Sequence, residues 1–215
     1  MKKNNHFAII ITAKKYNNIL RRTLKAIYKQ TILPQQLIIV LAETGKIIIP
    51  KNIKSRVVYS KIKNQVHQRT IGLKFLDKKI KIILQLDDKI ILEKNSIKFL
   101  LEEWENTDNN IAGIALNPKN YVRPKTNFFH YLTLTNSNID GKILPSGFAN
   151  GWSEIKKNRK MDWLNGGMTS WKLKFIPQIY KRKFPILKWS VCEDLFFSYN
   201  VSKKYNNILR RTLKA

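Results

Sequence analysis

The sequence predicts an α/β fold, in which helices flank a mostly parallel central sheet. Residues 7–11 and 37–41 are continuously apolar runs, which are typical of strands buried on both faces. Between these runs, apolar side chains recur at helical spacing over residues 19–27. Two buried strands joined by an amphipathic helix form a βαβ unit, which requires parallel pairing and a right-handed crossover.

The apolar pattern continues this architecture along the chain. Asn17 or Asn18 can cap the helix at 19–27, and Asn95 can cap the helix that follows it. The further elements predicted are strands at 57–59, 80–86 and 111–116, a strand from Met161 into the glycine pair at 166–167, and helices at 66–76, 96–104, 169–176 and 195–203.

Two stretches depart from this regular pattern. Residues 117–161 contain scattered prolines, glycines and aromatic residues, and a long irregular segment inside a compact domain often carries function. Residues 203–215 repeat residues 14–26 without a single difference. Such identity points to a recent duplication or an artefact and not to a structural repeat. We expect the copy to be able to form a helix that lacks the packing partner of the first.

Composition favours one folded domain over residues 1–215 with an anionic partner. The chain carries 41 Lys and Arg against 14 Asp and Glu, a net charge of +27. This balance suits nucleic acid, an acidic lipid surface or a phosphorylated substrate. Genome composition is an alternative cause, because the frequent Lys, Ile and Asn residues all use A/T-rich codons.

The single cysteine limits which redox compartment and which kinds of metal site are compatible with the chain. Cys192 has no partner for an intramolecular disulfide, and a site built from several cysteines is excluded. No stretch approaches the roughly 18 consecutive apolar residues of a membrane span. We expect a cytoplasmic protein that can also rest peripherally on the inner face of an anionic membrane.

Two adjacent carboxylates, Asp87 and Asp88, end the predicted strand at 80–86. Ligands of open parallel sheets bind at the carboxyl ends of strands, so Thr12, Ala13 and Glu43 should converge on the same crevice. A phosphate-bearing ligand there would be repelled unless a divalent cation, Mg²⁺ or Mn²⁺, lay between. The alternative is an ordinary solvated turn.

Four blocks of sequence, taken in order, carry a resemblance to a known family. They are 9–13 with 20–24 and Gln30, then 68–73, then 86–88 with Ile90 and Leu92, and finally 163–167 followed by 193–194. Together they resemble the family 2 glycosyltransferases, nucleotide-sugar-dependent enzymes with the GT-A fold, over nearly the whole chain. The resemblance implies metal-assisted, inverting transfer of a sugar from a UDP-linked donor to a hydroxyl of a glycan or lipid-linked acceptor.

The resemblance also implies roles for individual residues. Asp88 would hold the metal, and Asp194, beside Glu193, would be the catalytic base. The donor side would comprise Thr12, Ala13, Glu43, Arg69, Asp87 and Lys89, and the acceptor side Trp163, Gly166 and Gly167. Residues 1–116 would form the nucleotide-sugar-binding half, and residues 117–202 the half that binds the acceptor and carries the base.

Each of these residues has a simpler alternative. Arg69 could be a surface arginine of a very basic chain, Trp163 a core residue, and the pair at 166–167 a plain turn. Glu193 and Asp194 could serve only the electrostatics of a helix N-terminus.

Four positions on the donor side depart from the family pattern. Lys15-Tyr16 stands where Asn-Arg is usual, Leu41 where Asp is usual, Thr70 in place of Asn, and Lys89 in place of a third Asp. Lys89 could neutralise a diphosphate directly, or the donor site could be impaired. Two other functions therefore stay open: a degenerate glycosyltransferase, and a basic nucleic-acid-binding protein. The chain has no recognisable module for reading nucleic acid, so we expect no specific nucleic-acid partner.

Overall fold

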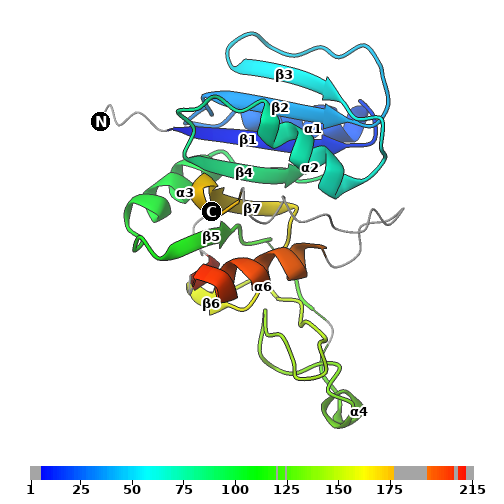
Figure 1. The fold of residues 1–215 in the computed structure, drawn as a ribbon, viewed down its shortest axis with the longest axis vertical. Helices are drawn as coiled ribbons and strands as arrows, with labels where there is room; N and C mark the ends of the chain where they lie inside the picture. Colours follow the sequence, from blue (N-terminus) through cyan, green and yellow to red (C-terminus); the bar gives the residue numbers. More distant parts are fainter. Residues whose placement is uncertain (1–5, 120, 124, 177–192, 206–207, 212–215) are drawn as a thin grey trace.

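The computed structural model describes residues 6–119, 121–123, 125–176, 193–205 and 208–211 (Figure 1). Its elements are β1 (Phe7–Ala13), α1 (Asn18–Tyr28), β2 (Gln36–Leu41), β3 (Lys54–Tyr59), α2 (Gln65–Lys74), β4 (Ile82–Asp87), α3 (Ser96–Glu105), β5 (Ile111–Ala115), α4 (Phe128–Leu132), β6 (Arg159–Met161), β7 (Met168–Lys172), a 3₁₀ turn (Leu173–Phe175), α6 (Glu193–Tyr205) and β8 (Ile208–Arg211). None of the helices in these ranges has the length and apolar character needed to cross a membrane.

The strands form one sheet in the order β3-β2-β1-β4-β7-β5-β8-β6. β1 to β4 are mutually parallel, whereas β7 runs antiparallel to both of its neighbours and β6 antiparallel to β8. The predicted mostly parallel α/β sheet is confirmed. The order reverses at β1, since β2 and β3 lie on one side of it and β4 on the other. The carboxyl ends of β1 and β4 therefore flank a topological switch point, where open sheets of this kind bind ligands.

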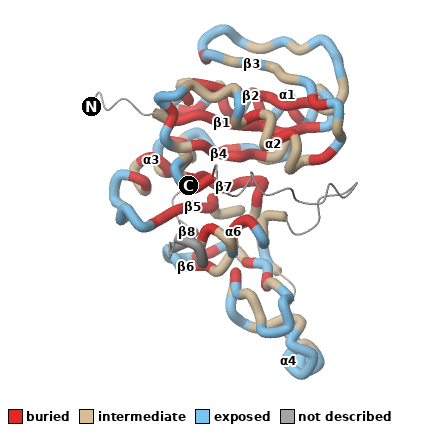
Figure 2. Tube along the Cα trace, in the orientation of Figure 1, coloured by how far each residue is buried: buried red, intermediate tan, exposed pale blue. Residues whose placement is uncertain are grey.

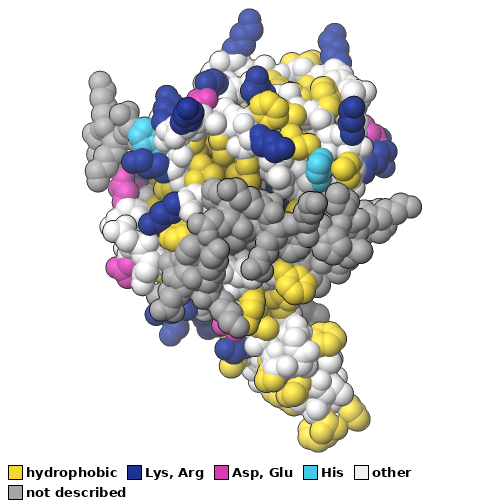
Figure 3. Space-filling model, viewed as in Figure 1, with side chains coloured by type: hydrophobic (Ala, Val, Ile, Leu, Met, Phe, Trp, Pro, Cys, Tyr) yellow, Lys and Arg dark blue, Asp and Glu magenta, His cyan; other side chains and the backbone are white. Residues whose placement is uncertain are grey.

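The irregular region at 117–161 projects from the end of the sheet that holds β6. α4 forms its far end (Figure 1), and most of its backbone is exposed or half-buried (Figure 2). Hydrophobic side chains gather on its surface (Figure 3). In contrast, the central strands β1, β2 and β5 are buried along their whole length.

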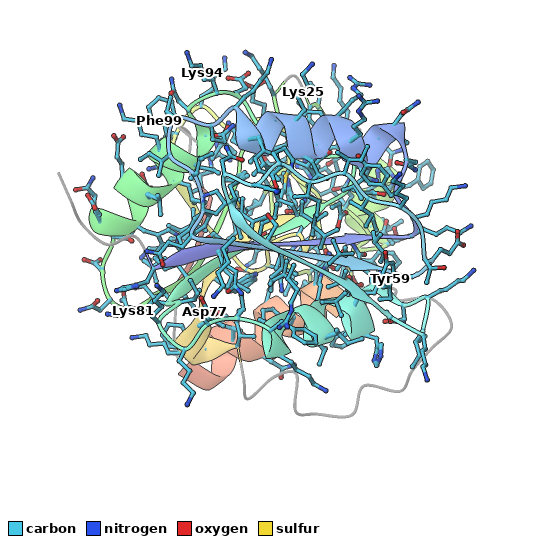
Figure 4. The ribbon with its side chains drawn as sticks, turned by 90° about the horizontal axis from the view of Figure 1, so that it is seen from above. Lys25, Tyr59, Asp77, Lys81, Lys94 and Phe99 are labelled. Carbon is cyan, nitrogen blue, oxygen red and sulfur yellow. The ribbon has the colours of Figure 1, made fainter. Side chains whose placement is uncertain are left out.

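Helices cover both faces of the sheet. Seen from above, α1 and α3 lie on one face, and α2 and α6 lie on the other (Figure 4). Alternate residues of β1 serve the two layers: Ile9 and Ile11 belong to the core with α1 and α3, whereas Ala8 and Ile10 belong to the core with Phe197 of α6. Because both faces of β1 are buried, the strand is apolar at nearly every position, as the sequence predicted.

The first half of the chain follows the sequence pattern closely. Asn17 is the cap of α1, and its side chain accepts a hydrogen bond from the backbone N–H of Leu20 at 3.0 Å. Asn95 occupies the same position before α3 but makes no capping hydrogen bond. Instead, its Oδ1 accepts a hydrogen bond from Thr31 Oγ1 at 3.1 Å. The predicted N-cap position of Asn95 is confirmed, but its side chain ties α3 to the segment after α1 and does not cap the helix.

The helix predicted at 169–176 was wrong, because Met168–Lys172 form β7 between β4 and β5. A strand in this place satisfies backbone groups along both of its edges. Trp171 of β7 is 1% exposed, and its ring lies where a Cβ on Gly113 of β5 would sit. Tertiary packing decided the state of a short segment whose local pattern was ambiguous. The strand predicted from Met161 into the glycine pair was also wrong, since β6 ends at Met161, where that strand was expected to begin.

The repeated segment contradicts the expectation of a second helix. Residues 203–205 complete α6, and Ile208–Arg211 form β8, which pairs with β5 and β6. The same four residue types at 19–22 lie in α1. Isolated helices of this length are marginal, so sheet pairing can override the local preference.

Candidate active site

The fold brings the two predicted acidic pairs together. Asp87 is the last residue of β4, in register with Thr12 of β1, and Asp88 follows it. Glu193 and Asp194 form the first turn of α6. The sequence separates these pairs by more than a hundred residues, yet one side chain contacts both.

Arg69 of α2 is the residue that joins the pairs. Its Nη2 donates a hydrogen bond to Asp87 Oδ1 at 3.3 Å, and its Nη1 donates to Glu193 Oε1 at 3.1 Å. The residue is only 4% exposed. A buried guanidinium is stable there because a carboxylate faces it on each side. The surface-arginine alternative is therefore wrong.

Two glutamines that sequence reasoning missed fix α2 against the sheet. Gln65 Nε2 donates hydrogen bonds to Asp87 Oδ1 and, at 3.4 Å, to Thr12 Oγ1. Gln68 Nε2 donates to the carbonyl oxygens of Ala13 at 2.8 Å and Val40 at 3.0 Å, at the ends of β1 and β2. The i, i+4 spacing of Gln65 and Arg69, which places both on one helix face, was the available signal.

Steric contacts explain why residues 166 and 167 are both glycine. A Cβ on Gly166 would overlap the Arg69 guanidinium, and one on Gly167 would overlap the Asp87 carboxylate. The backbone N–H of Asp87 also donates to the Gly167 carbonyl oxygen at 2.8 Å. We expected close approach of a ligand at this pair, but the groups that approach are the protein's own charged side chains. The pair does lie in a turn, as the alternative predicted, and the contacts of Gly166 and Gly167 explain why both positions are glycine.

Asp194 is held in a fixed orientation by backbone donors. Its Oδ2 accepts a hydrogen bond from the N–H of Gly166 at 3.1 Å, and its Oδ1 accepts one from the N–H of Leu195 at 2.9 Å. Asp194 lies in the first turn of α6, where the helix dipole favours negative charge. This agrees with the alternative that the acidic pair serves the electrostatics of a helix N-terminus. The additional bond from Gly166 ties this carboxylate to the segment that contacts Arg69 and Asp87.

Glu193 lies beside a small pocket between α2 and α6. Leu164, Trp171 and Phe197 line it together with Gln85 and the charged residues. Burial against this apolar lining raises the pKa of the Glu193 carboxyl, and the charge of Arg69 opposes that shift. Without Arg69, the carboxylate would be buried with no cation.

Asp88 follows β4, and its surroundings differ from those of the other three carboxylates. Thr23 Oγ1 donates to the backbone oxygen of Asp88 at 2.5 Å, which fixes the turn after β4. Burial, followed by the charge of Asp87, raises the pKa of the Asp88 carboxyl, and Lys89 opposes the rise. In the part of the chain that the structure describes, the backbone of Asp88 itself hydrogen-bonds this carboxylate, and no salt bridge joins it to another residue. Its environment therefore suits a bound cation.

A divalent cation at Asp88 would take further ligands from outside the described ranges of the chain or from the substrate. The described ranges contain no group of three or more His, Cys, Asp or Glu side chains able to hold a metal. Mg²⁺ commonly binds through one or two carboxylates, with substrate phosphates and water completing the shell. Asp88 fits that kind of site.

The remaining predicted residues have other partners. Glu43 follows β2 at the same edge of the sheet, where Lys63 at 3.0 Å and Lys14 at 3.8 Å pair with it. The hydrogen bond from Lys63 lowers the pKa of Glu43. Trp163 is half-buried, lies 4.5 Å from Trp152 between ring centroids, and donates its Nε1–H to the Asn150 oxygen at 3.0 Å. These contacts fix the position of the Trp163 ring and leave part of it exposed.

Ala13 and Lys89 have contrasting surroundings. Ala13 is buried at the end of β1, where it contributes its carbonyl to Gln68. Lys89 is exposed in the turn after Asp88. Cys192, expected just before α6, lies outside the described residues.

Solved structures with the same fold include proteins that bind nucleotide sugars. The chain resembles the crystal structure of S. aureus TarS 1-349 with a TM-score of 0.62 and 11% identity, over 97% of this chain and 58% of that one. Another TarS 1-349 structure is a complex with UDP-GlcNAc. GalNAc-T7 with UDP, GalNAc and Mn²⁺ matches with a TM-score of 0.66 and 13% identity, over 96% of this chain and 42% of that one.

The name of a third matching structure refers to a diphosphocytidyl compound and not to UDP or a UDP-sugar. The 4-diphosphocytidyl-2C-methyl-D-erythritolsynthase from Anaerococcus prevotii matches with a TM-score of 0.53 and 14% identity, over 96% of this chain and 87% of that one. No protein-family model and no curated protein matches the chain. The likenesses confirm the predicted GT-A-type fold, and the chain spans less than two thirds of TarS 1-349 and of GalNAc-T7.

Replacing the bridging arginine should destabilise the protein in a pH-dependent way. Arg69→Met leaves two carboxylates without their cation, and breaking a buried pair from one side costs about 3–5 kcal/mol. For a chain of this size, the melting temperature at pH 7 should fall by roughly 6–20 °C.

The pH dependence follows from the direction of the Glu193 pKa. A carboxyl whose pKa is raised by burial is favoured in its protonated form, so acidification should neutralise the stranded charge and narrow the difference from the parent. Thermal melts between pH 4 and 8 would measure this. Arg22→Met, at an exposed position of α1, is the matched control and should have little effect. If the melting temperature of Arg69→Met were lower than that of the parent by the same amount at every pH, this result would contradict the bridge.

Proposed function

We propose that this chain is a glycosyltransferase that moves a sugar from a UDP-linked donor to a hydroxyl of a glycan or lipid-linked acceptor. The observation that carries the proposal is the Arg69 bridge, which holds Asp87 and Glu193 together at the carboxyl ends of β1 and β4. That edge of the sheet is where nucleotides bind in folds with this strand order. The fold shared with structures that contain UDP or UDP-GlcNAc supports the choice of donor.

On the donor side, Asp87 would contact the ribose or the base, and Asp88 would face the diphosphate. A cation held by Asp88, Mg²⁺ or Mn²⁺, would neutralise the charge that develops on the departing diphosphate. Lys89 follows in the same turn, and as a flexible cation it can approach the same phosphate oxygens. Thr12, Ala13 and Arg69 would shape the crevice around the nucleotide.

On the acceptor side, Asp194 would act as the base. As the acceptor oxygen forms a bond to the anomeric carbon, the bond from that carbon to the diphosphate breaks, and the hydroxyl proton passes to Asp194. Attack on the face opposite the leaving group inverts the configuration. The two backbone donors that orient Asp194 support this role, because a base must be positioned before it can act.

Glu193 would act differently from its neighbour. Arg69 already engages it, so its charge serves the bridge more directly than it serves proton transfer. Gly166 and Gly167 would keep the acceptor-side segment close to Arg69 and Asp87, and Trp163 would form part of a wall for a sugar ring. The acceptor itself would be selected by the irregular region at 117–161.

Donor binding can be tested without knowing the acceptor. UDP with Mn²⁺ should raise the melting temperature, because a ligand at a hundred times its Kd stabilises the folded state by about 2.7 kcal/mol, which corresponds to roughly 5–10 °C. Asp88→Asn should remove the part of the shift that depends on Mn²⁺. Glu105→Gln, an exposed carboxylate of α3, is the control and should keep the full shift.

The same assay separates the other functions. No shift with any nucleoside diphosphate would favour a degenerate member that keeps only the fold. A shift with CTP but none with UDP would point to nucleotidyl transfer. Tight, steeply salt-dependent RNA binding with no nucleotide effect would favour the nucleic-acid-binding alternative.

Turnover tests the base independently of donor binding. Release of UDP from a panel of UDP-sugars with glycan and lipid acceptors should fall by about 10²–10⁴-fold in Asp194→Asn. The UDP and Mn²⁺ thermal shift should survive in the same variant. Asp77→Asn, whose parent residue pairs with Lys54 away from the crevice, should retain turnover. Activity retained by Asp194→Asn would remove Asp194 as the base.

A further inference from the structure

The far end of the irregular region exposes large apolar side chains. Phe128, Phe129 and Leu132 of α4 are 73%, 70% and 69% exposed. α4 lies at one extreme of the long axis of the molecule (Figure 1), and hydrophobic side chains gather at that end of the surface (Figure 3). Three neighbouring residues of this size in water mark an interaction surface, whereas a single exposed one would not.

This α4 tip has a defined conformation. The Asn127 side chain accepts a hydrogen bond from the His130 N–H at 2.9 Å, and His130 Nδ1 accepts one from the Asn127 N–H at 3.3 Å, a reciprocal capping box. Behind it, Arg123 pairs with Asp140 at 2.8 Å and donates to the Ser137 oxygen at 2.7 Å. These polar contacts hold the tip outward, so the exposed apolar side chains belong to an ordered end.

Most exposed charges of the region that carries the tip are basic, and Glu154 is the exposed acidic residue among its described residues. The sequence has no Asp or Glu from residue 117 to residue 139, and Lys125 is exposed next to α4. Asp140, the nearest acidic residue along the chain, is paired with Arg123. Lys156 and Lys157 add two exposed cations at the base of the same region. An anion at the tip would therefore meet cations and no unpaired carboxylate from this segment.

We propose that the α4 tip inserts into the headgroup layer of an anionic lipid bilayer. Aromatic side chains prefer the membrane interface, and lysines nearby are attracted to anionic lipids. The tip is a projecting end and not a groove, which suits a deformable surface that can close around it. The contact would leave the crevice at β1 and β4 accessible, because α4 lies beyond β6 and α6 (Figure 1). The proposal needs no nucleotide and does not depend on the proposed transferase activity.

Vesicle co-sedimentation tests the proposal directly. The protein should bind phosphatidylcholine vesicles that contain phosphatidylglycerol and should bind pure phosphatidylcholine vesicles much less. In the variant Phe128→Ser/Phe129→Ser/Leu132→Ser, binding should fall by about tenfold or more. The matched control is Ile19→Ser/Ile48→Ser/Ile91→Ser, which removes exposed apolar side chains elsewhere and should bind like the parent.

A second measurement does not rely on a multiple variant. Phe129→Trp places an indole at the tip, and brominated phosphatidylglycerol vesicles should quench its fluorescence beyond the quenching seen in the parent. Lys156→Gln/Lys157→Gln should weaken binding mainly at low salt, because it removes electrostatic attraction and leaves the apolar tip.

Three results would overturn the proposal. The first is vesicle binding by the tip variant that equals that of the parent, with an unchanged melting temperature. The second is fluorescence quenching in Phe129→Trp that does not exceed that of the parent. The third is that the parent binds no vesicles and forms a dimer that the tip variant does not form. The last result would assign the tip to a second copy of the chain.

Discussion

The ion bridge from Arg69 to Asp87 and Glu193 is the contact on which the arrangement of the candidate site depends. It joins α2 and the end of β4, which are neighbours in the sequence, to the start of α6, which lies more than a hundred residues further along the chain. A buried guanidinium costs free energy unless its donors are engaged, and an acidic pair at the end of a buried strand costs free energy unless a cation faces it. Asp87 and Glu193 engage the donors of the Arg69 guanidinium, and the guanidinium is the cation that faces Asp87.

The glycine pair and the two glutamines follow from this bridge. Gly166 and Gly167 leave the volume that the guanidinium and the Asp87 carboxylate occupy, and Gln65 adds a neutral donor to the same carboxylate. The bridge nevertheless leaves negative charge in excess, since one arginine faces two acidic pairs. Arg69 does not engage the Asp88 carboxylate, whose charged form is favoured by Lys89 and by a hydrogen bond from its own backbone. A cation-assisted diphosphate site is the chemistry that would use this carboxylate, in a chain whose net charge of +27 attracts such ligands.

The sequence predicted the fold class well in the first half because β1 and β2 are buried on both faces and α1 has one apolar side, so burial is visible as a local pattern. It predicted that residue 69 and the pair at 166–167 would matter, but only by resemblance. Their mutual contact could not be predicted, because it depends on how α2 and α6 meet across the sheet. β7 was predicted as a helix because its pairing with β4 and β5 likewise cannot be seen in the local sequence pattern. The four residue types that are helical at 19–22 and extended at 208–211 make the point within one chain: a short segment takes the state that its neighbours stabilise.

A crystal structure of the protein with UDP and Mn²⁺ would locate the cation through the anomalous signal of manganese. We expect a manganese peak within coordination distance of Asp88, shared with diphosphate oxygens, and a uridine at the carboxyl ends of β1 and β4 with the Arg69 bridge intact. Manganese bound away from Asp88, or UDP bound elsewhere on the molecule, would contradict it.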